Sequence, residues 1–369
     1  MRRTLSLTCL IFLGAILAFT AGCNSSSAPV TPGSSTNIVT GAGSTFLNPI
    51  MGRGISEFQG SHPGTAINYQ SIGSGGGIQQ MKKDLIDFGA SDAALDDDQL
   101  KEMPQLVQIP ESAGPVCITY NLADLKSPLK LSGDTLAGIF LGKIKSWQDS
   151  AIKQDNPGAA LPNSEIVVAH RSDGSGTSSI FTTFLDKVSP EWHRQVGKGI
   201  SVKWPAGIGG KGSEGVTGVV RQSAGSIGYV ELSYAKENNL PVALVKNRAG
   251  NWTEPTAAAT TAAIQAFEQD LAKDVRAPIV DPPASAKDGY PICGLTYLLI
   301  PKTAKDPSKG KIVKDFVQYI VTTGQNSAES LSYAKLPSGL AEQDQKLLGD
   351  VSARSPRAPV PIVAAAVQP

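Results

Sequence analysis

Small polar residues stand at four points of this sequence where a strand is expected to give way to a helix. These stretches are 41–49, 72–78, 87–93 and 170–181, the last reading His-Arg-Ser-Asp-Gly-Ser-Gly-Thr-Ser-Ser-Ile-Phe. A helix start exposes unpaired backbone N–H groups at the positive end of the helix dipole. Glycine lets that backbone approach a ligand closely, and hydroxyls add donors without charge. Residues of these types at such positions are suited to holding an anion.

The last stretch adds a cation. Arg171 would supply a forked, permanently charged donor for a tetrahedral oxyanion, and Asp173 could orient that donor by pairing with it.

Each of these features alone has a structural alternative. Ser44, Thr45 or Ser74 could simply cap a helix, and Arg171 with Asp173 could be a surface ion pair. Asp92 alone would more often be a cap or a solvated acid. The occurrence of all four junctions together favours an anion site.

Attack on a bound group is not supported. Neither Ser74 nor Ser175 stands in a Gly-x-Ser-x-Gly elbow, because the preceding glycine is adjacent. The sequence has only three histidines, at positions 62, 170 and 193, and strand alternation would point His170 away from its neighbour Arg171. A serine mechanism therefore has no evident base, and we predict that the protein is not an enzyme.

Nucleotide and metal sites are not indicated either. The stretch 207–213 resembles a phosphate loop, but Gly212 follows Lys211 where serine or threonine is needed, and we interpret it as a mobile loop. The glycines after Ile72 do not form a dinucleotide fingerprint, and no metal-ligand spacing is present. We predict no cofactor and no metal.

Short β-rich runs alternate with helical patterns along the chain. Strands are predicted at 67–72, 116–120, 166–169, 226–232 and 297–300. Helical spacing of apolar residues appears at 78–85, 180–188 and 312–320. This alternation predicts an α/β fold with a mostly parallel sheet, in which ligands lie beyond the strand ends.

Length and charge limit the class of protein. A chain of 369 residues with 41% hydrophobic content can bury a large core and suggests two domains or lobes. The 33 basic residues nearly balance the 32 acidic ones, so there is no basic surface to recruit nucleic acid.

The N-terminus is typical of an exported protein. Arg2 and Arg3 precede an apolar run at 10–19, and small residues then lead to Cys23. This pattern resembles the lipobox of bacterial lipoproteins, although Thr20 replaces the usual leucine. We therefore predict a signal peptide at 1–22, a lipidated Cys23 with a flexible tether at 23–38, and a disordered tail at 351–369. The alternative is an ordinary signal peptide with an incidental cysteine. The run is too short for a spanning helix, so the lipid would be the only membrane contact.

The remaining cysteines of the exported chain are Cys117 and Cys293, in two strand-like runs. An extracytoplasmic location permits a disulfide between them, and two buried free thiols are the alternative.

The motifs together resemble a known family, the phosphate-binding lipoproteins of bacterial high-affinity phosphate ABC transporters. The resemblance runs from Gly41 to about Pro337, and its marks include Gly-Ala-Gly-Ser-Thr-Phe (41–46), Asp-Phe-Gly-Ala-Ser-Asp (87–92), Arg-Ser-Asp-Gly-Ser-Gly-Thr (171–177), Ser-Ile-Gly-Tyr-Val-Glu (226–231) and Tyr-Ala-Lys-Leu-Pro (333–337). It implies a two-lobed clamshell that closes on one inorganic phosphate and delivers it to membrane permease subunits.

The resemblance also implies a ligand set and a division of the chain. The phosphate ligands carried over by motif are Thr45, Phe46, Ser74, Asp92, Arg171, Ser175, Gly176 and Thr177, with Asp173 holding the arginine. Lobe 1 would comprise 39–117 and 290–350, and lobe 2 would comprise 118–289. The protein would be a monomer in the periplasm or at the outer face of the cell membrane. An exported phosphatase and a phosphate-sensing surface lipoprotein on the same fold are the alternatives.

Overall fold

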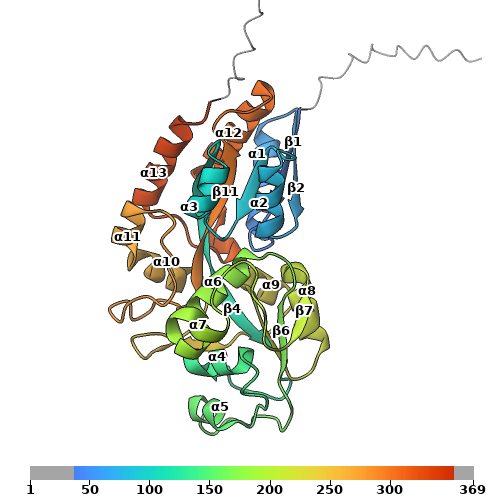
Figure 1. The fold of residues 1–369 in the computed structure, drawn as a ribbon, viewed down its shortest axis with the longest axis vertical. Coiled ribbons are helices and arrows are strands. Elements are labelled where there is room, and N and C mark those ends of the chain that lie inside the picture. Colours follow the sequence, from blue (N-terminus) through green and yellow to red (C-terminus); the bar gives the residue numbers. More distant parts are fainter. Residues whose placement is uncertain (1–36, 353–369) are drawn as a thin grey trace, which may run out of the picture. The chain divides into compact units, whose positions relative to one another are not determined.

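The structure is a computed structural model that describes residues 37–352 (Figure 1). These residues belong to one compact unit. The predicted signal peptide, Cys23, nearly all of the tether and the tail from residue 353 lie outside the described residues. Within the described part of the chain, no helix is both long enough and apolar enough to cross a membrane.

One mixed sheet of eight strands runs through the fold, in the order β2-β1-β3-β11-β4-β8-β6-β7. Its strands are β1 (Asn37–Gly43), β2 (Thr65–Ser71), β3 (Phe88–Ser91), β4 (Leu106–Tyr120), β6 (Val167–Arg171), β7 (Ile208–Gly210), β8 (Ser226–Glu231) and β11 (Cys293–Pro301). β1 pairs in parallel with β2 and β3, and β6 pairs in parallel with β7 and β8. A smaller sheet contains β5 (Lys130–Leu131), β9 (Leu244–Lys246) and β10 (Trp252–Thr253).

The two parallel sets are joined by β4 and β11, which pair antiparallel along their lengths. β11 is also antiparallel to β3, and β4 is antiparallel to β8. We call the set around β1 to β3 the first lobe and the set around β6 to β8 the second lobe. The predicted two-lobed α/β class, with a mostly parallel sheet in each lobe, is confirmed, and the two antiparallel crossing strands make the whole sheet mixed.

Helices flank both lobes. Figure 1 shows one group beside the first lobe: α1 (Asn48–Ser61), α2 (Ser74–Lys82), α3 (Asp97–Glu102), α12 (Pro307–Ile320) and α13 (Ser338–Gly349), with the short turns η1 (Thr323–Ser327) and η2 (Glu329–Leu331) nearby in sequence. The second lobe carries α4 (Gly133–Phe140), α5 (Ser150–Asp155), α6 (Gly176–Val188), α7 (Pro190–Gln195), α8 (Gly212–Gln222) and α9 (Leu232–Glu237). Between β10 and β11 the chain forms α10 (Ala257–Gln265) and α11 (Glu268–Lys273).

The predicted strands and helices are all present, with one error at a helix end. α6 and α12 bury apolar faces that include Phe181, Leu185, Phe316 and Val317, as their spacing predicts. The predicted helical stripe through Leu85 is wrong at that residue, because α2 ends at Lys82 and Leu85 is 65% exposed. Asp84 has a φ of 55° at the point where the chain leaves the helix.

The two described cysteines, Cys117 and Cys293, are buried free thiols. The structure therefore has the alternative of two thiols and not the disulfide. Cys117 packs in a small cluster with Val216, Val220 and Val230. Cys293 belongs to the main core, and its Sγ lies 3.3 Å from the carbonyl oxygen of Tyr290. Because the two sulfurs pack in separate apolar clusters, the considered disulfide is not formed. Burial raises the pKa of Cys293 to about 12, which makes its thiol inert.

Candidate functional site

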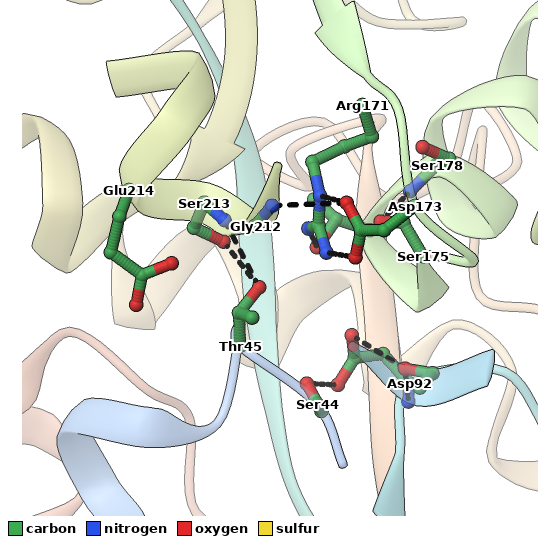
Figure 2. Close-up of polar contacts among 12 residues, drawn as sticks. Ser44, Thr45, Asp92, Arg171, Asp173, Ser175, Ser178, Gly212, Ser213 and Glu214 are labelled. Atoms are coloured by element: carbon green, nitrogen blue, oxygen red, sulfur yellow. Dashed lines mark hydrogen bonds and ion pairs between the residues drawn. The ribbon is translucent and has the colours of Figure 1, made fainter. Parts of the chain in front are cut away.

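The four predicted junctions lie together where the two lobes meet: Figure 2 shows Ser44, Asp92 and Arg171 of three of them, and Ser74 of the fourth lies 3.4 Å from Asp92. Ser44 follows β1, Ser74 begins α2 after β2, and Asp92 follows β3. Since β1, β2 and β3 are parallel neighbours, these side chains meet at one edge of the sheet. Arg171 ends β6, and Ser175 precedes α6 on the facing lobe.

Asp92 is a buried carboxyl held by hydroxyl groups. Its side chain is 5% exposed. The Ser44 hydroxyl donates a short hydrogen bond to Oδ1, and the Ser74 hydroxyl lies 3.4 Å from Oδ2. The Ser74 oxygen also accepts from the Asp92 backbone N–H at 3.2 Å. Burial raises the pKa of Asp92 to about 7, against the opposing effects of the Ser44 bond, the charge of Arg171 and the Ser74 bond.

Arg171 and Asp173 form a buried pair on the second lobe. Arg171 is 3% exposed, and its Nε and Nη2 donate to the two Asp173 oxygens at 2.8 and 2.6 Å. Nη1 also donates to the Thr177 hydroxyl at 3.3 Å, and the Gly212 N–H donates to Asp173 Oδ1 at 3.0 Å. Burial by itself would raise the pKa of Asp173, but the bonds and charge of Arg171 outweigh it and lower that pKa. The guanidinium is therefore fixed in place by a carboxylate.

The start of α6 supplies backbone donors. Ser175 is the N-cap, and its hydroxyl accepts from the Ser178 N–H at 3.0 Å. The first N–H groups of a helix have no partner within the helix, so those of Gly176 and Thr177 suit an anion. Gly176 has no room for a side chain: an added Cβ would lie 2.5 Å from the Ser74 hydroxyl oxygen and 2.6 Å from Asp92. This glycine allows the two lobes to approach closely.

The first lobe touches the second through Thr45. The Thr45 hydroxyl lies 2.8 Å from the Ser213 hydroxyl, and its oxygen accepts from the Ser213 N–H at 3.2 Å. The hydroxyl of Tyr234 donates to the Thr45 carbonyl at 2.6 Å. A second contact joins the Gly75 N–H to the Gly174 carbonyl at 2.9 Å. These bonds hold the lobes in contact around the site.

Phe46 anchors the segment that follows Thr45. Its side chain is fully buried and meets the ring of Tyr333 edge-on, with ring centroids 5.9 Å apart. The Tyr333 hydroxyl donates to the Phe46 carbonyl at 2.5 Å. The predicted role of Phe46 as a backbone ligand is therefore compatible with its position beside Thr45, because the ring anchors the segment in the core.

Sequence reasoning missed Ser213. The stretch 207–213 was predicted to be a mobile loop, which is wrong: it contains β7 and the first residues of α8. β7 pairs in parallel with β6, so Ser213 stands at a further strand-to-helix junction beside the others. The glycine and serine before an amphipathic helix were the available signal, and they matched the pattern of the other four stretches.

The three histidines have partners outside this group of side chains. His62 stacks on Phe58, with ring centroids 4.0 Å apart, and His193 Nδ1 lies 2.8 Å from Asp186. His170 stacks on Trp204 at 5.0 Å, and Trp204 in turn stacks on Tyr229 at 5.6 Å.

Figure 2 shows Asp92, Thr45 and the Arg171–Asp173 pair around one small region.

Comparison with known proteins identifies the family. Residues 30–323 match the PBP superfamily domain. The phosphate-binding protein PstS of Xylella fastidiosa strain Temecula1 is 43% identical over 306 residues, which cover 83% of each chain. The chain belongs to the PstS family of phosphate-binding proteins. The PstS protein of Methanocaldococcus jannaschii is 38% identical over 331 residues, covering 84% of this chain and 85% of that one.

A solved structure agrees with the PstS fold. The phosphate-binding protein from Stenotrophomonas maltophilia superposes with a TM-score of 0.63 at 20% identity, covering 84% of this chain and 93% of that one. The similarity extends across both lobes because it covers most of both chains. The chain brings together one arginine, several hydroxyl groups, the N–H groups at helix starts and one carboxyl, Asp92, whose pKa is raised. This set can hold an anion that has a proton to donate.

Proposed function

We propose that this protein binds inorganic phosphate outside the cytoplasm and delivers it to the membrane permease of a phosphate ABC transporter. Membership of the PstS family supports this function. The observation that carries it is the placement of Asp92 opposite the Arg171–Asp173 pair, with α2 and α6 beginning between them. These groups match the charge and the proton of phosphate.

The proposed ligands divide between the lobes. They are Thr45, the Phe46 backbone, Ser74 and Asp92 on the first lobe, and Arg171, Ser175, the Gly176 backbone and Thr177 on the second. Thr45 shows how the lobes cooperate. Its oxygen accepts from the Ser213 N–H, and when the Ser213 hydroxyl is the donor of their 2.8 Å contact, the Thr45 hydrogen remains to be donated to phosphate. Asp173 fixes the guanidinium and does not touch the anion.

Asp92 gives the site its preference for phosphate over sulfate. A carboxylate beside an anion is repulsive unless it accepts a proton from that anion. Phosphate near neutral pH keeps at least one proton, whereas sulfate keeps none. Above about pH 7, where Asp92 is ionised, bound sulfate would leave it facing a like charge with no hydrogen bond, which costs on the order of a few kcal/mol. Arsenate also keeps a proton, so Asp92 does not exclude it.

Delivery follows from closure of the lobes. We propose that the chain moves as two bodies around β4 and β11. One body is formed by 39–117 with 290–350 and the other by 118–289, and phosphate favours their closed arrangement. The permease would read that closed form. The protein would act as a monomer, held to the membrane by lipid on Cys23 alone. It would not turn over its ligand, because the proposed site residues bind phosphate without an activated nucleophile.

Isothermal titration of the purified protein tests the function, after bound anion has been stripped. We expect tight one-to-one phosphate binding at neutral pH, and no heat with sulfate at pH 8, where Asp92 is ionised. Binding of neither anion would contradict the proposal and favour a surface lipoprotein with another role. Release of phosphate from a phosphomonoester would instead support the phosphatase alternative.

A further inference from the structure

Glu111 occupies an irregular position in a crossing strand. Along β11, Thr296 pairs with Ser112 and Tyr297 pairs with Pro110, so Glu111 is the extra residue of a β-bulge on β4. Such a bulge changes the direction of a side chain and interrupts the ladder. The Glu111 carbonyl accepts from Gln325 Nε2 at 2.8 Å, which secures the backbone of the bulge. The side chain is thus placed in the segment that joins the two lobes.

The Glu111 carboxyl is buried and unpaired. The residue is fully buried, and neither carboxyl oxygen has a hydrogen-bond partner among the described residues. No lysine or arginine in residues 37–352 forms an ion pair with it. An ionised carboxyl in such surroundings is costly, so the group favours its neutral form. A buried acid without a partner is rare enough to require an explanation.

Glu111 and Asp92 lie on either side of one strand, because Tyr297 of β11 pairs with Ser91, the residue before Asp92, and with Pro110, the residue before Glu111. Burial, and secondarily the charge of Asp92, raise the pKa of Glu111 to about 8. Tyr69 of β2 and Tyr333 are also titratable here. Burial raises the pKa of both phenols, with the charges of Asp92 and Glu111 adding at Tyr69 and those of Glu231 and Asp92 adding at Tyr333, so both stay neutral. β11 presents Thr296 and Tyr297 beside the bulge, and η1 presents Gln325, all uncharged. The site therefore lies between one cation on the second lobe and two acids on the first.

We propose that Glu111 is a further affinity-determining residue of the anion site, and that its buried carboxyl must hold a proton for phosphate to bind tightly. This inference rests on the proposed phosphate-binding function. The neutral acid adds no charge behind Asp92, whereas the ionised acid would repel the incoming anion. Glu111 does not touch phosphate and acts through the electric field at the site.

The direction of the pH dependence follows from linkage. Phosphate brings negative charge near Glu111, so the pKa of Glu111 is higher in the complex than in the free protein. The proton is held in both states below about pH 8, and Glu111 then has no effect on binding. Above that pH the free protein loses the proton, binding must take it up, and affinity falls. Each unit of difference between the two pKa values corresponds to about a tenfold loss.

The test measures phosphate affinity between pH 6.5 and 9.5 in the wild type, Glu111→Gln and Glu111→Met. Both variants remove the titrating proton, and methionine also removes the unpaired polar atoms. Across this range the phosphate affinity of the wild type should fall by a factor about ten times larger than the factor for either variant. Titration in two buffers of different ionisation enthalpy at pH 8.5 should show that phosphate binding takes up more protons in the wild type than in either variant.

Asp344→Asn is the matched control. Asp344 is another fully buried carboxyl with no hydrogen-bond partner among the described residues, and burial raises its pKa to about 8. It lies on α13, away from the strand-to-helix junctions of the site. This variant should change the pH dependence of stability while its phosphate affinity follows the wild-type profile.

The outcomes separate the two proposals. A wild type that fails to bind phosphate at pH 6.5 contradicts the proposed function itself. Tight binding at pH 6.5 with parallel profiles for the wild type and both Glu111 variants overturns the role of Glu111 and leaves the function intact. A flattened profile in Asp344→Asn as well would assign the effect to general stability, which also overturns the role of Glu111.

Discussion

Asp92 and Asp173 are two carboxyls on facing sides of one candidate site, and their pKa values move in opposite directions. Asp92 is buried among hydroxyls, and burial raises its pKa to about 7. Asp173 is half-buried, and its two bonds to Arg171 outweigh burial and lower its pKa. The comparison shows that deeper burial without a paired cation raises the pKa of one carboxyl, whereas a paired cation keeps the other charged.

The difference divides the work of binding. The second lobe has a permanent and internally neutralised charge pair, so its geometry is fixed before a ligand arrives. The first lobe has a carboxyl whose protonation can change near neutral pH. In the proposed site, recognition of charge would fall to one lobe and recognition of a proton to the other. The variants below either remove the difference between the Asp92 and Asp173 carboxyls or test how closely the two lobes must approach each other.

Arg171→Ala should have the largest effect, because it leaves Asp173 buried without its cation. Loss of one partner of a buried pair costs about 3–5 kcal/mol, and the anion also loses its forked donor. We expect phosphate affinity to fall by more than about a hundredfold, measured by titration calorimetry. Lys311→Ala is the control, since its pair with Asp315 is exposed at 72% and 41% and should matter little. Retained affinity in Arg171→Ala would place the anion elsewhere.

Asp92→Asn should change the choice of anion. The amide keeps the size of the side chain but can donate to an anion that has no proton. We expect the ratio of phosphate to sulfate affinity to fall about a hundredfold, or about 3 kcal/mol, mainly through a gain in sulfate binding. The pH dependence between 6 and 8 should also weaken, because Asp92 titrates near 7 in the free protein. Unchanged rejection of sulfate would contradict the role given to Asp92.

Gly176→Ala tests the approach of the two halves. The added Cβ would lie 2.5 Å from the Ser74 hydroxyl oxygen, so the lobes would have to separate. We expect about a tenfold loss of phosphate affinity, measured by calorimetry, and a larger radius in solution scattering. Gly218→Ala is the matched control, because its Cβ would meet nothing within 4 Å. An equal effect of both substitutions would show that the contact at Gly176 is unimportant.

Ser213→Ala should have the smallest effect. It removes the hydroxyl 2.8 Å from Thr45 but keeps the backbone N–H bond that orients the Thr45 oxygen. A neutral hydrogen bond contributes about 1 kcal/mol, so phosphate affinity should fall by less than about tenfold. Thr45→Val should lose more, because it removes a proposed ligand. The reverse ranking, measured by the same titration, would indicate that Ser213 and not Thr45 holds the anion.

Much of the fold was predictable because local pattern and tertiary structure agree. The apolar spacing of α6 and α12 matches the faces that they bury, and the short β-rich runs are strands. β4 was only partly predicted, since Val116–Tyr120 is its final third and the strand begins at Leu106. Pro110 and Pro115 argue against a central strand, and here the bulge and the long pairing with β11 accommodate them.

The site was predictable in its residue types but not in all its neighbours. Strand-to-helix junctions have a recognisable composition, so Ser74, Asp92 and Arg171 could be selected from sequence. Ser213 has the same local composition, but only the pairing of β7 with β6 shows that it lies beside the other junctions. Glu111 had no local signal at all. Its significance comes from burial and from Asp92, which is 19 positions away in sequence and lies in a strand-to-helix junction, whereas Glu111 lies within β4.

The aromatic stack behind Arg171 has an optical consequence. Trp204 lies on His170, the residue before Arg171, and also on Tyr229, whose hydroxyl accepts from the Arg171 N–H at 3.1 Å. An indole that stacks on both of these neighbours of Arg171 responds to changes of local field. Its ultraviolet emission should therefore act as an intrinsic reporter of occupancy, and the capture and release of the anion could be followed in real time without attaching a dye.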